Sequence, residues 1–104
     1  MSPTQCTLKW LAREGWTADV VERFIPGAKI RKDAFGFGDI LAFRADQTAL
    51  IQCTSASNHS SRVKKVNVSS AATGWLGGRD RIILVLSWKK GDNQEPHKIT
   101  RWPK

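Results

Sequence analysis

Two apolar runs decide the fold of this chain: Asp39-Ile40-Leu41-Ala42-Phe43-Arg44, then a turn at Ala45-Asp46-Gln47, then Thr48-Ala49-Leu50-Ile51-Gln52-Cys53-Thr54. Both runs are strongly apolar, as is typical of central strands that are covered on both faces of a sheet. The short turn between them predicts an antiparallel hairpin. We therefore expect this hairpin to form the centre of the sheet.

Polar residues interrupt the hairpin at specific places. Because side chains alternate along a strand, Gln52 and Thr54 should share one face, while Cys53 and Ile51 pack into the core on the other. In an antiparallel pair, Asp39 can approach Gln52 across the ladder. We interpret Asp39 as functional; the alternative is a turn cap that bonds amides of the Gly36–Gly38 loop. Gln52 either contributes to a site or bonds a buried backbone group.

Outward from the hairpin, apolar periodicity predicts the order helix, three strands, helix, and one or two strands. A polar segment at Lys29–Gly38 precedes the hairpin, and a polar break at Ser55–Ser60 follows it. Because a helix separates the third and fourth strands, we expect an α/β fold with a mixed four- to five-stranded sheet flanked by two helices. The length allows one domain, residues 1–104. The predicted helices are Thr4–Glu14 and His59–Leu76; the predicted strands are Ala18–Ile25, Asp39–Arg44, Thr48–Thr54, Arg81–Trp88 and an edge strand, His97–Trp102.

The net charge of +8 is unevenly divided along the chain. Residues 1–56 hold seven Lys/Arg and six Asp/Glu, whereas residues 57–104 hold ten and three, a balance of +7. A polyanionic partner is indicated, because each neutralised phosphate releases counterions. The alternative is a basic surface that serves only solubility. The stretch from Ala56 to Gly78 contains no acid, which favours phosphate contact.

Location is predicted from what the sequence lacks. No run approaches the roughly eighteen apolar residues of a membrane span, and the first residues lack a basic-then-apolar signal pattern. The two cysteines, Cys6 and Cys53, have neither a paired framework nor metal-ligand spacing. We expect a cytoplasmic protein without membrane contact, in which Cys53 is a small core residue.

A family resemblance is carried by Arg31-Lys32-Asp33-Ala34-Phe35-Gly36-Phe37-Gly38-Asp39-Ile40-Leu41-Ala42 and by Leu50-Ile51-Gln52-Cys53-Thr54-Ser55. These residues resemble the catalytic hairpin of the PD-(D/E)XK nuclease superfamily, in particular archaeal-type Holliday junction resolvases and virus-type replication-repair nucleases. In that pattern an Asp begins one strand and an acid-x-Lys motif follows on its neighbour. Asp39 takes the first place and Gln52-Cys53-Thr54 the second. The resemblance covers roughly residues 4–66, and the order of elements extends it to Trp88.

The resemblance implies a restriction-endonuclease-like core and an endonuclease that hydrolyses phosphodiester bonds of duplex or branched DNA. It also implies Mg²⁺ or Mn²⁺, bound here by Asp39, Gln52 and Glu22, since carboxylate and amide oxygens suit such ions. A homodimer is implied as well, and the small size suits a phage or mobile-element protein.

Two departures from the pattern affect the predicted chemistry. Gln52 stands where the family has an acid, and Thr54 stands where it has the lysine; the first helix also offers only Thr4 and Gln5 where resolvases carry a carboxylate. Glu22, or secondarily Asp33, is the candidate for a second carboxylate. A lysine can come from the second helix, where His59, Arg62 and Lys65 follow at three-residue steps. The predicted catalytic set is Asp39, Gln52, Glu22, Thr54 and Lys65.

The predicted DNA-binding set is His59, Arg62, Lys64, Lys65, Arg31 and Lys32. Each has a plainer alternative: His59 as a helix-cap residue, and the lysines and arginines as a solvated face. A rival to the nuclease is an inactive pseudo-nuclease with the same fold, which binds nucleic acid or inhibits another protein. A protein-binding module unrelated to nucleic acid would leave the basic second half unexplained.

Overall fold

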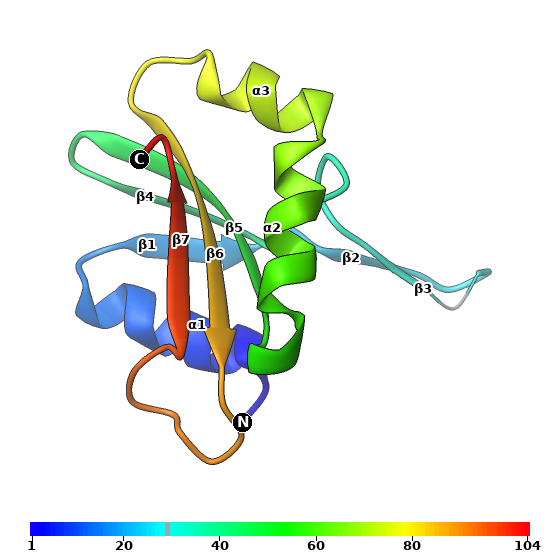
Figure 1. Ribbon diagram of the computed structural model, residues 1–104, viewed down its shortest axis with the longest axis vertical. Coiled ribbons are helices and arrows are strands. Elements are labelled where there is room, and N and C mark those ends of the chain that lie inside the picture. Colours follow the sequence, from blue (N-terminus) through cyan, green and yellow to red (C-terminus); the bar gives the residue numbers. More distant parts are fainter. Residues whose placement is uncertain (29) are drawn as a thin grey trace.

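The computed structural model describes residues 1–28 and 30–104; Lys29, with which the predicted polar segment begins, lies outside the described residues. Within these ranges five strands form a mixed sheet in the order β1-β4-β5-β6-β7 (Figure 1). β5 and β6 pair in parallel, and the other neighbours pair antiparallel. The prediction of an α/β fold with a mixed sheet flanked by helices is confirmed. The strands are β1 (Thr17–Val20), β4 (Ile40–Arg44), β5 (Gln47–Ser55), β6 (Arg81–Trp88) and β7 (Lys98–Trp102).

The central hairpin has the predicted register. Leu41 lies opposite Leu50, and the amide of Asp39 donates to the carbonyl of Ile51 at 2.8 Å. The chain enters β4 over Leu50, where a Cβ on Gly38 would lie 2.6 Å from the Leu50 side chain. A glycine is therefore required directly before Asp39.

Helices cover both faces of the sheet. On one face, α1 (Pro3–Arg13) packs Cys6 and Leu11 against Ile51 and Cys53 of β5. On the opposite face, α2 (His59–Asn67) and α3 (Ser70–Leu76) pack over a second apolar cluster. That cluster includes Phe37, Leu50, Val66, Ala72 and Val85. No helix in the two described ranges has the length and apolar character needed to cross a bilayer.

The predicted second helix, His59–Leu76, is wrong as a single helix. It divides into α2 and α3 because α2 ends at Asn67 and Ser69 begins a new helix, its hydroxyl accepting a hydrogen bond from the amide of Ala72 at 3.1 Å. A serine that bonds the third amide after it is a strong helix start, which overrides continuous periodicity. A short 3₁₀ turn, η1 (Ala56–Asn58), precedes α2.

The predicted strand Ala18–Ile25 is also wrong as one strand. The carbonyl of Asp39 accepts from the amides of both Val21 and Glu22, at 2.9 and 3.2 Å, and the main-sheet ladder stops there. The chain then forms β2 (Arg23–Ile25), which pairs antiparallel with β3 (Ile30–Lys32) in a hairpin of its own. In Figure 1 this hairpin projects away from the main sheet. Part of the predicted polar segment is therefore a strand.

Candidate metal and phosphate site

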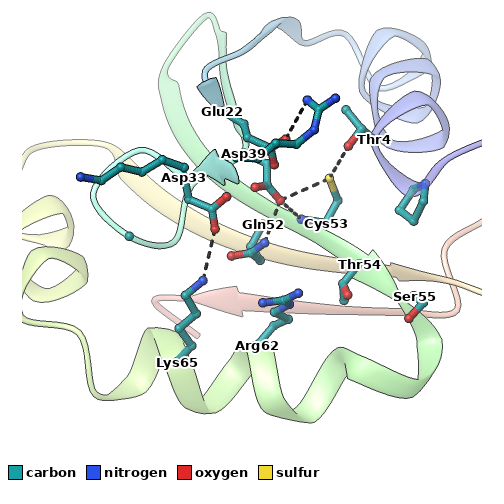
Figure 2. A pocket seen from close by; sticks show the side chains of 14 residues that line it. Thr4, Glu22, Asp33, Asp39, Gln52, Cys53, Thr54, Ser55, Arg62 and Lys65 are labelled. Carbon is teal, nitrogen blue, oxygen red and sulfur yellow. Dashed lines mark hydrogen bonds and ion pairs between the residues drawn. The ribbon is translucent and has the colours of Figure 1, made fainter. Parts of the chain in front are cut away.

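An open pocket of about 700 Å³ lies where β4 begins and β5 ends, beside the loop before β4 and facing α2 (Figure 2). It gathers most of the site residues that the sequence predicts. Its acidic side chains are Glu22, Asp33 and Asp39; its basic ones are Arg31, Lys32, Arg62 and Lys65; Thr4, Gln52 and Thr54 also line it. Lys64 is exposed on α2, and neither it nor His59 lines this pocket.

Asp39 is the centre of the site and is only 4% exposed. Its Oδ2 accepts hydrogen bonds from Gln52 Nε2 at 2.7 Å and from the Cys53 amide at 3.0 Å. Its Oδ1 is buried and accepts no hydrogen bond from the described residues. The bonds of this carboxylate thus run to the neighbouring strand rather than to the Gly36–Gly38 loop, against the turn-cap alternative.

Gln52 approaches Asp39 across the ladder, as predicted, but through its amide nitrogen. The side chain is 3% exposed, and within the described part of the chain its Oε1 is buried without a partner. Buried polar atoms in native proteins are nearly always paired, so each exception needs a reason. Here two oxygens, Asp39 Oδ1 and Gln52 Oε1, are left without a donor in one pocket.

Two loops bring further carboxylates to Asp39. The bonds from the Val21 and Glu22 amides to the Asp39 carbonyl fix the backbone of Glu22 beside β4. A tight turn, in which the Gly36 amide donates to the Asp33 carbonyl at 3.3 Å and Gly36 has φ +82°, returns Asp33 to the same place. Carboxylate oxygens of Glu22, Asp33 and Asp39 all lie within 4.8 Å of one another.

The crowding of carboxylates changes their proton affinity. Burial raises the pKa of Asp39 to about 8, and the hydrogen bond and negative charge of Asp33 add to this against the opposing Cys53 amide. Burial also raises the pKa of Asp33, but the hydrogen bonds from Asp39 and Lys65 and the charges of Lys65 and Arg62 outweigh it, so the pKa of Asp33 is lowered. Without a cation, Asp39 therefore keeps a proton near neutral pH while Asp33 is ionised.

The basic side of the pocket comes equally from α2, with Arg62 and Lys65, and from β3, with Arg31 and Lys32. Lys65 Nζ lies 3.2 Å from Asp33 Oδ2, and Figure 2 shows Lys65 and Arg62 rising from α2 toward the carboxylates. The Nε of Arg62 is buried and has no partner among residues 1–28 and 30–104. Opposite them, Arg31 Nη1 lies 3.2 Å from Glu22 Oε1. Lys65 is thus the lysine of the second helix that lies beside the carboxylates.

His59 lies elsewhere, in a cluster of its own between α2 and the sheet. It is 5% exposed; its Nδ1 bonds the Ser87 hydroxyl and its Nε2 bonds the Thr100 hydroxyl, both at 2.8 Å. Burial lowers its pKa, with the nearby charges of Lys98 and His97 adding to the effect. Its predicted contact with DNA phosphate conflicts with this placement, because both ring nitrogens are already bonded inside the protein.

Thr54 and Cys53 complete the β5 edge of the pocket. Thr54 is buried and lines it, but its hydroxyl brings no charge. Burial raises the pKa of Cys53 to about 12, so the thiol remains protonated and is a poor nucleophile. Cys53 packs in the core, as predicted. The member that sequence reasoning ranked too low is Asp33, whose approach depends on the turn ending at Gly38.

Comparison of the chain with models of known protein families, with curated proteins and with solved structures finds no match. The resemblance to the PD-(D/E)XK superfamily therefore stays a prediction.

Proposed function

We propose that this protein is a metal-dependent phosphodiesterase that acts on DNA. The observation that carries the proposal is a pair of buried oxygens that accept no hydrogen bond from the described residues, Asp39 Oδ1 and Gln52 Oε1, beside the carboxylates of Glu22 and Asp33. A cation would satisfy both oxygens and relieve the repulsion that now holds a proton on Asp39. Buried polar atoms in native proteins are nearly always paired, so these two oxygens support a binding site rather than a plain core.

The donor set fits Mg²⁺ or Mn²⁺. Carboxylate and amide oxygens are the ligands these ions prefer, and neither sulfur nor imidazole belongs to the cluster. Asp39, Asp33 and Glu22 would hold the ion, with Gln52 Oε1 as a neutral fourth donor. When bound, such an ion polarises a phosphodiester and lowers the pKa of water.

The residues of the chain itself have distinct roles in this proposal. Asp39 would release its proton to solvent if the site held a cation, and the Cys53 amide would help to stabilise the resulting charge. Arg62 and Lys65 bind the phosphate oxygens, a role for which Thr54 lacks the charge. Lys65, now paired with Asp33, would be free to contact the phosphate if a cation neutralised that carboxylate. The basic residues thus neutralise the substrate charge at the point of cleavage.

A second candidate is an inactive DNA-binding protein of the same fold. The ion pairs Lys65–Asp33 and Arg31–Glu22 favour it, because they neutralise two of the three carboxylates without a metal. The replacement of an acid by Gln52 lowers the charge further. Such a protein would bind DNA through its basic face and would not cleave it.

Cleavage of labelled DNA separates the two candidates. Wild type and Asp39→Asn are incubated with single-stranded, duplex and four-way-junction DNA in Mg²⁺, Mn²⁺ or EDTA. We expect cutting that requires a metal and is lost in Asp39→Asn, with Asp46→Asn, in the exposed turn after β4, as matched control. Binding without cutting in every metal would instead establish the inactive alternative, and equal cutting by Asp39→Asn would disprove the site.

A further inference from the structure

The β2–β3 hairpin, here called the arm, carries an exposed aromatic residue beside the pocket. Phe24 is 55% exposed although it lies in the middle of β2. Its cross-strand partner is Arg31, which lines the pocket. Residues directly opposite each other in an antiparallel pair project from the same face. Phe24 therefore lies on the pocket side of the arm.

The position of Glu22 gives an estimate of the distance between Phe24 and the pocket. Glu22 lines the pocket two residues before Phe24, and two residues of extended chain span about 7 Å. The Arg31 guanidinium is held by Glu22 at 3.2 Å while its side chain stays 71% exposed, so it retains donors for a ligand. An aromatic ring thus stands about one or two nucleotides from the proposed metal site, with a guanidinium between them.

Charge indicates what the arm contacts. Residues 23–32 contain four Lys/Arg residues and no Asp or Glu. A second copy of this arm would carry the same charge and be repelled, whereas a nucleic-acid strand is attracted. An exposed aromatic ring beside cationic side chains is the combination that binds single strands, by stacking on a base while the cations contact the backbone.

We propose that Phe24 is a stacking platform for an unpaired base next to the phosphate held in the pocket, so that the preferred substrate is single-stranded or locally unpaired DNA. The inference rests on the proposed function only for the identity of that phosphate. A base inside a duplex stacks on its neighbours and cannot lie on Phe24 without leaving the helix. The arm would therefore select substrates by base accessibility.

Binding in EDTA tests the arm without cleavage. Fluorescence anisotropy is measured with a labelled 12-nucleotide single strand and with its blunt duplex. Phe24→Ala is expected to weaken single-strand affinity about 5- to 100-fold and duplex affinity less than about twofold, while Phe24→Trp restores single-strand binding. The control is Phe43→Ala, since Phe43 is 57% exposed near the far end of β4.

Three results would overturn the inference. Phe24→Ala could bind single strands as tightly as the wild type, or it could lose the same affinity for single-stranded and duplex DNA. Light scattering could also give Phe24→Ala a different molar mass from the wild type, which would make Phe24 an oligomer contact. Its failure is distinguishable from failure of the proposed function. If the wild type cuts DNA but Phe24→Ala binds it equally well, only the proposal for the arm is disproved. If the wild type never cuts DNA, yet requires Phe24 to bind single strands, only the catalytic proposal is disproved.

Discussion

Two buried polar clusters lie on the same face of the sheet and differ in one respect. In the His59 cluster, both ring nitrogens have hydroxyl partners on β6 and β7. In the Asp39 cluster, Asp39 Oδ1 and Gln52 Oε1 have none within the described ranges. Burial alone therefore does not distinguish a structural polar group from a functional one. The two clusters differ in whether their hydrogen bonds are saturated, and an unpaired buried group costs stability.

The largest expected effect is on cleavage. Asp39→Asn keeps the shape of the side chain but removes the central charge of the unsaturated cluster. We expect cleavage to fall at least about 10³-fold, equivalent to about 4 kcal/mol in the activation free energy. Rates with saturating Mn²⁺ measure this, and His59→Gln, if folded, should cut at nearly the wild-type rate. A stronger loss in His59→Gln than in Asp39→Asn would reverse the comparison.

The next effect is on stability. His59→Ala leaves the Ser87 and Thr100 hydroxyls without their partner in a buried space. We expect the free energy of unfolding to fall by about 2–4 kcal/mol. Urea unfolding at pH 7 measures it, with His97→Ala as control because His97 is exposed. An unchanged midpoint would mean that the saturated cluster contributes little to stability.

The two clusters should respond to pH in opposite directions. The folded pKa of Asp39, about 8, lies above its ordinary value of 3.8, so the folded state binds the extra proton and stability falls as pH rises from about 4 to 8. His59 has a lowered pKa, so its contribution is lost as pH falls below about 6.5. In EDTA at pH 8, the free energy of unfolding of Asp39→Asn should exceed that of the wild type by about 1–3 kcal/mol. Thermal unfolding of both proteins at pH 5 and pH 8 checks this; a stability difference between Asp39→Asn and the wild type that is the same at both pH values would contradict it.

The smallest effect concerns the basic residues of α2. Arg62 faces the pocket and Lys64 is exposed away from it. We expect Arg62→Ala to weaken DNA binding about tenfold and to reduce the salt slope by about one, as for one lost phosphate contact. Lys64→Ala should cost only about twofold. Titrations at several salt concentrations compare them, and equal losses would point to a diffuse basic surface rather than a site.

Much of this arrangement could be predicted from local pattern. The Asp39–Thr54 hairpin and the strand Arg81–Trp88 follow from continuous apolar runs, and the pairing of Asp39 with Gln52 follows from alternation and register. The break at Ser69 could not be separated from a continuing helix, because serine is tolerated in both.

Parts of the site depend on tertiary contacts that no local pattern contains. Asp33 reaches Asp39 only through the turn that ends at Gly38, and Glu22 through two amides that share one carbonyl. The burial of His59 depends on Ser87 and Thr100, which are distant in sequence. Basic neighbours on α2 favoured a phosphate contact for His59, whereas its orientation toward the sheet decides its role.

Binding of Mn²⁺ tests most directly whether the unsaturated cluster is a cation site. Isothermal titration at pH 7 is performed with wild type, Asp39→Asn and His97→Ala. We predict one ion per chain for wild type and His97→Ala, with release of a proton as Asp39 ionises, and loss of binding in Asp39→Asn. Undiminished binding by Asp39→Asn, or no binding by the wild type, would contradict the assignment of the Asp39 cluster as a metal site.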